Sequence, residues 1–366
     1  MQFDHRHYVP CLRWKQGEYQ AVSRLPIMVK ENFTPLIEAP EIGWDHENSR
    51  QAKTIDEHLA PFAKRIYRKW GQQACFVDLG ILAPFTGMES GVHPLRFVFD
   101  QLRTMECEAI PVTEPGRDKA FQREVKRTLD KDRFGVCLRI PIEQAAKDLL
   151  RAEVDSLLSA LGARPQNCDL VLDLDAPNFV PLDGFSRAIL AVVTRLPHLR
   201  EWRTFAVLGT SFPETVAGIR KGGERIQRYE WQLYKLLATC FNDAGIRLPT
   251  FGDHVIAHPK VLDLDMRLVK PSATIRYAIE DGWYVVKGEN VRDYKFEQYR
   301  ELSKNVVNSP YYYGSTFSWG DEYIMNCATG VGKTGNLSMW RQVGTNHHVT
   351  VVTQDIASFY ASSDSP

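Results

Sequence analysis

The sequence of 366 residues lacks several features that would assign a protein class at once. Its seven cysteines form no CxxC pair, which argues against a zinc ribbon, and their scatter through apolar runs argues against a disulfide framework. No apolar run approaches the ~20 residues that are needed to cross a bilayer. The first ten residues, MQFDHRHYVP, contain no signal-peptide core. These absences predict a cytoplasmic protein with no membrane partner.

The sequence also lacks an excess of either charge. Lys plus Arg equals Asp plus Glu at 45 each, so no global field favours binding along nucleic acid, although a local basic groove remains possible. The first predicted turn, RWKQGEYQ, has a single glycine, whereas the doubly wound dinucleotide-binding folds have a glycine-rich first turn. With 44% hydrophobic and 25% charged residues, the composition is that of an ordinary globular protein.

What the sequence does contain is a repeated pattern of a short apolar segment followed by an amphipathic helical stretch. Eight such apolar segments predict strands: YVPCLRW, TPLIEAP, ACFVDLG, AIPVTEP, GVCLRIP, CDLVLDLDAP, TFAVLGTSFP and PTFGDHVIAHP. Eight βα units over about 260 residues have the size of a (β/α)8 TIM-type barrel. We therefore predict an α/β protein with this barrel over residues 1–270; an open doubly wound sheet is the alternative.

The repeated pattern of an apolar segment followed by a helical stretch stops in residues 271–366. TIRYAIEDGWYVVKG predicts a β-hairpin with Asp281-Gly282 as its turn, and YKFEQYRELSKNVV predicts a helix. The remaining tail is rich in aromatic residues and glycine and ends in HHVTVV, which is typical of a strand. We expect these residues to form an α+β extension, an aromatic-rich cap that packs on the barrel.

Nearly every predicted strand ends in an ionisable or hydroxyl group. Because TIM barrels carry their chemistry at the carboxyl ends of the strands, these side chains are the candidate site. They are Glu38, Asp78, Glu114, Arg139, Asp173, Asp175, Ser211, Asp253 and His254.

Asp173 and Asp175 end the sixth strand, where a period of two would place both on one face. A ring of acids at the mouth needs positive charge, because neighbouring carboxylates raise one another's pKa. Arg139 offers one charge, and Mg²⁺ or Mn²⁺ held by Asp78, Asp173 and Asp175 would offer two more. Alternatively, some of these acids cap the helices that follow.

The chain resembles the family called Beta protein, which is found in phages, prophages and bacterial genomic islands. The resemblance runs from YVPCLRWKQGEYQAVSRL and TPLIEAPE through FGDHVIAHP to RYAIEDGWYVVKG and GNLSMWRQVGTNHHVTVV. It implies a role in phage–host conflict, such as antiviral defence. The residues that the family pattern emphasises are Lys15, Glu18, Glu38, Asp78, Arg139, Asp173, Asp253, Arg276, Trp283, His347 and His348.

Three functions follow from these residues. In a metal-assisted hydrolase of phosphate esters, acting on a small molecule, nucleotide or nucleic acid, Glu38, Asp78 and Asp173 would hold the metal ion that activates the attacking water. Arg139 would then bind the phosphate and His347 would protonate the leaving group. Substrate-binding residues would be Lys15, Ser211, Asp253, His254, Arg276 and Trp283. A glycoside hydrolase would instead use a Glu38/Glu114 or Glu114/Asp173 pair. The third is a non-catalytic recognition module that binds its ligand in the barrel mouth and joins a protein partner in a defence complex.

Overall fold

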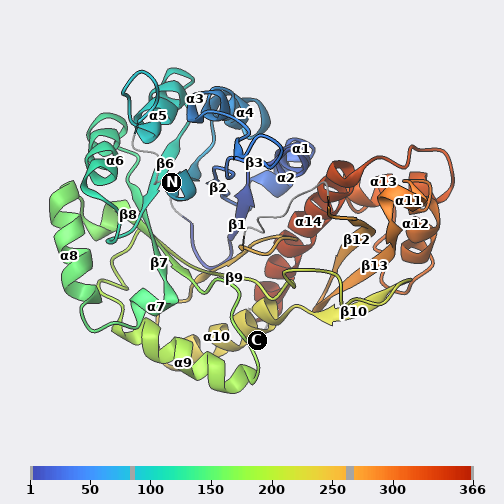
Figure 1. Cartoon of the computed structure of the whole chain (residues 1–366). Coiled ribbons are helices and arrows are strands. Elements are labelled where there is room, and N and C mark those ends of the chain that lie inside the picture. The colour runs from blue at the N-terminus through green and yellow to red at the C-terminus, as the bar shows by residue number, and fades with distance from the viewer. Residues whose placement is uncertain (1–2, 83–86, 261–267, 364–366) are drawn as a thin grey trace. The chain divides into compact units, whose positions relative to one another are not determined.

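The eight apolar segments predicted as barrel strands are all strands in the computed structural model, which describes residues 3–82, 87–260 and 268–363. They pair in parallel and close into a barrel in the order β1-β11-β9-β8-β7-β6-β5-β2. The predicted (β/α)8 barrel is therefore confirmed (Figure 1). The strands are β1 (Tyr8–Arg13), β2 (Leu36–Glu38), β5 (Cys75–Asp78), β6 (Ala109–Thr113), β7 (Val136–Pro141), β8 (Cys168–Asp173), β9 (Thr204–Gly209) and β11 (Thr250–Asp253).

The chain divides into two compact units. The first, which holds the barrel, comprises Met1–Trp14, Phe33–Gly209 and Glu230–Asp253. The second comprises Lys15–Asn32, Thr210–Tyr229 and His254–Pro366, so it also draws on segments from the first 270 residues.

Side chains that point inward from the strands form the barrel's apolar core. A cluster of buried residues takes Cys11 from β1, Leu36 from β2, Phe76 from β5, Cys137 from β7 and Val171 from β8. Side chains on one face of a strand recur every second residue. The next inward positions on these strands, at or near their carboxyl ends, are Arg13, Glu38, Asp78, Arg139 and Asp173. The alternation that builds the core thus also directs these polar groups into one end of the barrel.

Helices surround the strands, and their apolar stripes face the barrel. In α4 the buried residues Phe62, Ala63 and Ile66 lie at helical spacing. Helix α6 begins after Asp118, whose side chain accepts hydrogen bonds from two backbone N–H groups of the first turn. The helices of this unit are α3 (Ile55–Leu59), α4 (Phe62–Lys69), α5 (Pro94–Thr104), α6 (Lys119–Asp132), α7 (Ile142–Ala145), α8 (Leu150–Leu161), α9 (Leu182–Arg195) and α10 (Tyr229–Asp243). Two 3₁₀ turns (Gly80–Leu82 and Pro165–Asn167) and a short hairpin of β3 (Trp44–Asp45) and β4 (Arg50–Gln51) complete it.

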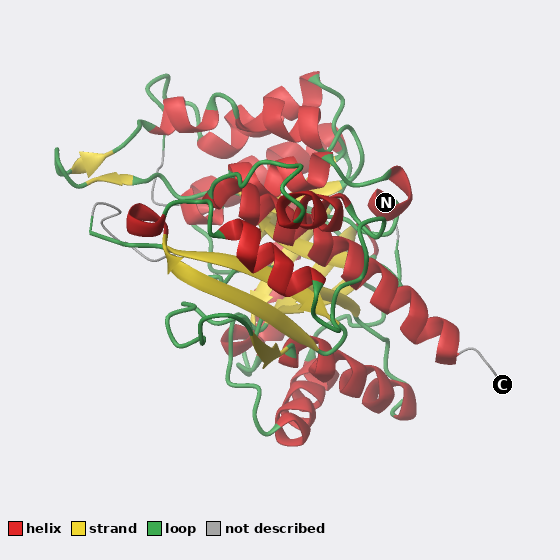
Figure 2. Cartoon of the chain, turned by 90° about the vertical axis from the view of Figure 1, so that its right-hand side faces the viewer, coloured by secondary structure: helices red, strands yellow, loops and turns green. Residues whose placement is uncertain are grey.

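The second unit is built on an antiparallel sheet with strand order β10-β13-β12 (Figure 2). The predicted hairpin is confirmed, but its two turn residues are Glu280 and Asp281, because Ile279 pairs with Gly282. The strands are β10 (Glu224–Gln227), β12 (Ser272–Ile279) and β13 (Gly282–Asn290). The helices are α1 (Gln16–Ser23), α2 (Ile27–Lys30), α11 (Val291–Tyr294), α12 (Tyr299–Val307), α13 (Trp319–Ala328) and α14 (Leu337–Ser363).

The strand predicted for HHVTVV was wrong, because these residues lie inside the 27-residue helix α14. The run is rich in β-branched valine and threonine, which favour strands only weakly and yield to tertiary packing. In the helix, His347, His348, Val349, Val351 and Val352 are all buried. Burial on several sides of the helix therefore outweighs the local preference for a strand.

We expect Tyr8→Phe to lower the free energy of unfolding by about 1–3 kcal/mol, because a buried acceptor that loses its donor is costly. The Tyr8 hydroxyl donates to Oδ1 of Asp253, and both residues are fully buried. The change can be measured by urea denaturation. Tyr67→Phe, at a position 43% exposed on α4, is the control and should change stability little. Equal stability of the two variants would show that the hydroxyl contributes nothing.

Candidate functional site

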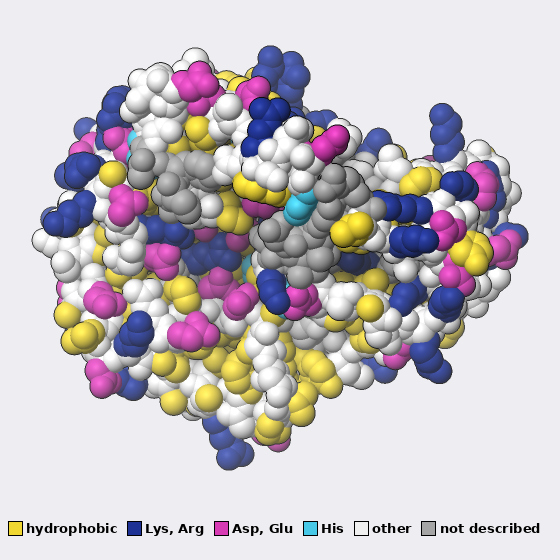
Figure 3. Space-filling model, viewed as in Figure 1, with side chains coloured by type: hydrophobic (Ala, Val, Ile, Leu, Met, Phe, Trp, Pro, Cys, Tyr) yellow, Lys and Arg dark blue, Asp and Glu magenta, His cyan; other side chains and the backbone are white. Residues whose placement is uncertain are grey.

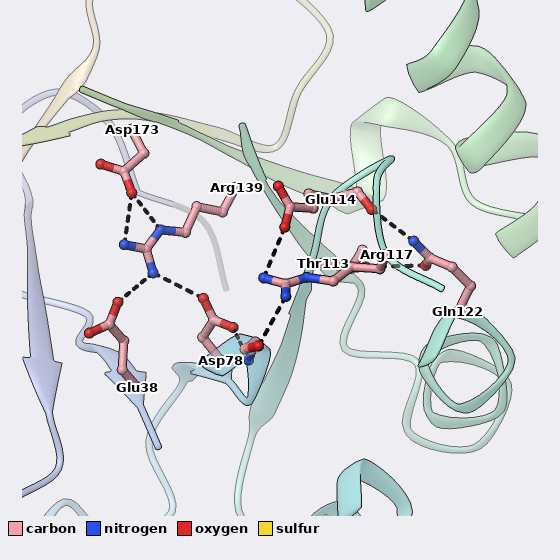
Figure 4. A network of polar contacts seen from close by, with 9 residues as sticks. Glu38, Asp78, Thr113, Glu114, Arg117, Gln122, Arg139 and Asp173 are labelled. Carbon is pink, nitrogen blue, oxygen red and sulfur yellow. Dashed lines mark hydrogen bonds and ion pairs between the residues drawn. The ribbon is translucent and has the colours of Figure 1, made fainter. Parts of the chain in front are cut away.

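Three carboxylates from three strands meet one guanidinium at the carboxyl end of the barrel. Arg139 Nη1 donates to Oε1 of Glu38 at 2.6 Å and to Oδ2 of Asp78 at 2.9 Å. Arg139 Nε donates to Oδ2 of Asp173 at 2.7 Å. Figure 4 shows the acids on opposite sides of the guanidinium. These four residues are the acid–arginine cluster, and the structure brings together Glu38, Asp78, Arg139 and Asp173 as the sequence predicted.

Backbone amides hold two of the acids in place. The other oxygen of Asp78, Oδ1, accepts from the N–H of Gly80 at 2.7 Å. Asp173 Oδ1 accepts from the N–H of Asp175 at 2.8 Å. Glu38 differs, because its second oxygen, Oε2, lies 3.7 Å from Nε of Arg13. Asp78 and Asp173 are thus fixed on both oxygens by these bonds, and Glu38 is bonded to Arg139 through one.

A second ion pair extends this network. Arg117 lies 3.0 Å from Glu114 and donates to the carbonyl of Gly80 at 3.0 Å. A Cβ atom at Gly80 would lie 2.2 Å from Arg117 Nη2 and 2.8 Å from Asp78 Oδ1. Only glycine therefore allows Arg117 and Asp78 to approach the same turn. Gln122 donates to the carbonyl of Glu114 and accepts from Thr113 (Figure 4).

The cluster is largely buried but still reaches solvent. The exposed fractions are 18% for Glu38, 15% for Arg139, 12% for Asp173 and 7% for Asp78. Burial works against the charge of Arg139, but the charges of Asp173 and Glu38 outweigh it, so the pKa of Arg139 is raised well above its usual value. In Figure 3 acidic and basic side chains lie beside one another in the hollow over the barrel.

The charges at the mouth nearly balance. Three carboxylates of the cluster face the guanidinium groups of Arg139 and Arg13, so these five side chains carry a net charge of −1. Burial, followed by the nearby charge of Glu38, raises the pKa of the Cys11 thiol well above its usual value. Cys11 therefore remains a protonated thiol and adds no charge.

The residues present do not fit a divalent metal site. No group of three or more His, Cys, Asp or Glu side chains within residues 3–82, 87–260 and 268–363 has the arrangement of metal ligands. The inward oxygens of the cluster acids are bonded to Arg139, whose guanidinium occupies the position between them. Asp175 does not share a face with Asp173, because β8 ends at Asp173 and Asp175 is exposed with φ of 58°. Mg²⁺ or Mn²⁺ as a cofactor stays a prediction.

The other predicted barrel residue, Asp253, is fully buried and accepts a hydrogen bond from Tyr8. The six remaining candidates belong to the second unit. Trp283 is buried and stacks on His348 with ring centroids 4.8 Å apart. The Ser211 hydroxyl accepts from the N–H of Tyr229 at 2.9 Å. Lys15 precedes α1, His254 is buried and follows β11, and Arg276 lies on β12.

His347 is fully buried in the second unit. Its Nδ1 lies 2.8 Å from Oδ2 of Asp321, and its Nε2 lies 2.8 Å from the carbonyl oxygen of Ala278. The ring of Tyr277 stacks on it at 3.8 Å. Both ring nitrogens are therefore engaged by acceptors within the unit.

Sequence reasoning missed Arg13 and Arg117 as members of this site. Arg13 could have been found, because it is two residues beyond Cys11 and thus shares its inward face. Arg117 lies in the loop after β6, and its position depends on the turn at Gly80. No local pattern indicates that contact.

A family model described as Beta protein matches residues 8–354. The chain belongs to the Beta protein family. The match includes every residue of the acid–arginine cluster and most of the second unit, and it confirms the resemblance noted from the sequence. No curated protein matches the chain. Among the residues that the structure describes, no helix has the length and apolar character required to span a membrane.

Proposed function

We propose that the acid–arginine cluster is the active site of a hydrolase in which Glu38 is the general base. The observation that carries this proposal is the convergence of Glu38, Asp78 and Asp173 on Arg139 at the carboxyl end of a (β/α)8 barrel. This end holds the active site in essentially every characterised enzyme with this fold. Fold alone does not name a reaction, so the roles rest on the geometry of the cluster.

Glu38 is the acid best placed to accept a proton. It is the most exposed of the three cluster acids, with 18% of its side chain accessible. Asp78 and Asp173, which amides and Arg139 hold on both oxygens, fix the guanidinium in position. A base held within reach of water contributes roughly 10²–10⁴-fold to the rate of such reactions.

Arg139 would supply the electrostatic stabilisation. A guanidinium has five N–H donors, and four nitrogen-to-oxygen contacts to the cluster acids are present. The fifth N–H has no partner among the described residues, so it is free to donate to a substrate oxygen that gains negative charge. Arg13 adds a second positive charge beside Glu38.

A phosphate ester remains the proposed substrate class. The net charge of −1 on the acid–arginine cluster and Arg13 repels a dianionic monoester more than a monoanionic diester. We therefore expect a diester to be preferred. Water would attack phosphorus while its proton passes to Glu38, and the bond from phosphorus to the leaving oxygen would break. The metal-assisted version predicted from the sequence contributes no step to this scheme.

The test is Glu38→Gln, which keeps the shape of the side chain and removes its basicity. We expect the parent to release p-nitrophenolate from bis(p-nitrophenyl) phosphate faster than from p-nitrophenyl phosphate, and Glu38→Gln to lose ~10²–10⁴-fold of this rate. Glu47→Gln, at an exposed position in the same unit, should match the parent. Assays with and without Mg²⁺ distinguish metal-assisted hydrolysis from the metal-independent scheme. Release of p-nitrophenolate from p-nitrophenyl glucoside tests for glycoside hydrolysis. Equal rates for the parent and Glu38→Gln would sink the proposal.

A non-catalytic recognition module in phage–host conflict is the second candidate. The observation that favours it is the mutual pairing of the cluster acids with Arg139, which makes the mouth rigid and preformed. This candidate requires ligand binding at the mouth without turnover. A parent protein that hydrolyses none of the probes would therefore favour the recognition module.

A further inference from the structure

A cavity of about 370 Å³ lies wholly within the second unit. It is lined by the loop around Thr215, by β12 and by the first turn of α14. Two arginines, Arg276 from β12 and Arg341 from α14, line it together with Thr274 and Tyr299. None of its lining residues belongs to the acid–arginine cluster.

The described contacts of Arg276 are with neutral groups. Its Nη1 donates to the carbonyl of Ile256 at 2.7 Å, and its guanidinium lies 4.9 Å from the ring centroid of Phe212. Within residues 3–82, 87–260 and 268–363, no carboxylate forms an ion pair with it. Burial, with the nearby charge of Arg341, lowers the pKa of Arg276 well below its usual value, although Glu18 acts weakly in the opposite sense. An anion in the cavity would relieve this cost.

Arg341 brings a second guanidinium to the same place. Its Nη1 donates to the Ile256 carbonyl at 2.9 Å, so both arginines converge on one acceptor. Two glycines allow α1 to pack against Arg341 and α14 to pack against the backbone of Arg276. A Cβ atom at Gly17 would lie 2.5 Å from Arg341 Cγ, and one at Gly344 would lie 2.9 Å from the carbonyl oxygen of Arg276. The close packing of α1 and β12 on α14 therefore holds the two cations together.

Neutral donors complete the lining. The Tyr299 hydroxyl accepts from the N–H of Thr274 at 3.0 Å, which leaves its own hydrogen available to donate. Burial raises the pKa of Tyr299 to about 12, so the hydroxyl remains protonated at neutral pH. Lys270 also lines the cavity but is paired with Asp293 at 3.1 Å. The described residues that line the cavity thus include several hydrogen-bond donors and no Asp or Glu.

We infer that this cavity binds a phosphate dianion, free or as a small ester, between Arg276 and Arg341. Guanidinium groups bind phosphate through paired N–H donors, and Arg276 has no carboxylate ion-pair partner among the described residues. A volume of about 370 Å³ accommodates phosphate with a small organic group, in the range typical of small-molecule sites. This site goes beyond the proposed hydrolase, because it uses no residue of the acid–arginine cluster.

Isothermal titration calorimetry of the full chain with inorganic phosphate and with glycerol 3-phosphate tests the inference. We expect both to bind the parent, and Arg276→Gln to weaken binding by at least about 10-fold, the value of a hydrogen bond between charged groups. If glycerol 3-phosphate binds more tightly than inorganic phosphate, the part of the cavity away from the arginines contacts the glycerol group. Equal affinities would identify inorganic phosphate as the ligand.

Controls separate this site from the rest of the protein. Arg220→Gln, at a position in the same unit whose side chain is 80% exposed, should bind phosphate like the parent. Glu38→Gln should also keep its phosphate affinity, so failure of the hydrolase proposal would not change this result. Arg341→Gln is the second variant if Arg276→Gln does not fold. No binding of either probe by the parent, or parental affinity in a folded Arg276→Gln, would overturn the inference.

Discussion

Arg139→Ala is expected to lower the free energy of unfolding by about 3–5 kcal/mol, the cost of breaking a buried ion pair by removing one partner. In the parent, the guanidinium binds Glu38, Asp78 and Asp173 at 2.6–2.9 Å. Without it, three carboxylates that are 7–18% exposed would face one another with no cation between them. Urea denaturation at neutral pH measures the change, and any activity at the barrel mouth should be lost as well.

Two variants separate this effect from the loss of a side chain. Arg139→Lys keeps the charge but has fewer donors in a different geometry, so its stability should lie between those of the parent and Arg139→Ala. Arg195→Ala removes a surface partner of Asp148, where the side chains are 59% and 91% exposed, and should cost less than about 1 kcal/mol. If Arg139→Ala were as stable as the parent, the guanidinium would not balance the acids.

Asp321→Asn is the second change from which we expect a loss of about 3–5 kcal/mol. The Asp321 carboxylate is fully buried and accepts from the Tyr277 hydroxyl at 2.6 Å and from His347 Nδ1 at 2.8 Å. His347 Nε2 also faces an acceptor, the carbonyl of Ala278. Asparagine would remove the buried acid that pairs with His347 and accepts from Tyr277.

This change should also alter the dependence of stability on pH. Burial opposes the charge of Asp321, but His347 together with the hydrogen bonds from Ser318 and Tyr277 outweighs burial and lowers the pKa of this carboxyl in the folded protein. A lowered pKa contributes stability above the unfolded value of about 4, and this contribution is lost as the pH falls through the folded value. Asp321→Asn should lack this part of the acid sensitivity. Glu301→Gln, at a side chain that is 72% exposed on α12, is the control and should keep the parent's acid sensitivity. If Asp321→Asn also kept it, the carboxyl of Asp321 would not be the source of this pH dependence.

The barrel and the centre of its site could be predicted because both follow from local alternation. Each apolar run is short, is followed by a helical stretch, and places its last inward residue at the carboxyl end of the strand. Barrel closure then brings Glu38, Asp78, Arg139 and Asp173 to one mouth, although Glu38 and Arg139 are 101 residues apart. No contact had to be known in advance, because the fold itself supplies the proximity.

The features that could not be predicted depend on contacts between distant segments. The β-branched residues of HHVTVV favour a strand locally, and only their burial in the second unit makes them helical. The position of Asp175 depends on where β8 ends, and that of Arg117 depends on the turn at Gly80. The pairing of Arg276 with Arg341 at the Ile256 carbonyl requires knowledge of how α14 packs on β12.

The interleaving of the two units has a consequence for synthesis on the ribosome. Helix α1 depends on α14, since Asn346 Nδ2 donates to the carbonyl of Ala21 across 325 residues of sequence. At roughly 5–20 residues per second, α1 would wait on the order of 20–60 s for that partner. Strand β1 likewise waits for β11, since Tyr8 pairs with Phe251. A nascent chain thus leaves one edge of β1 unpaired until β11 is made and one face of α1 uncovered until α14 is made, and neither unit can be produced from one contiguous segment of the chain.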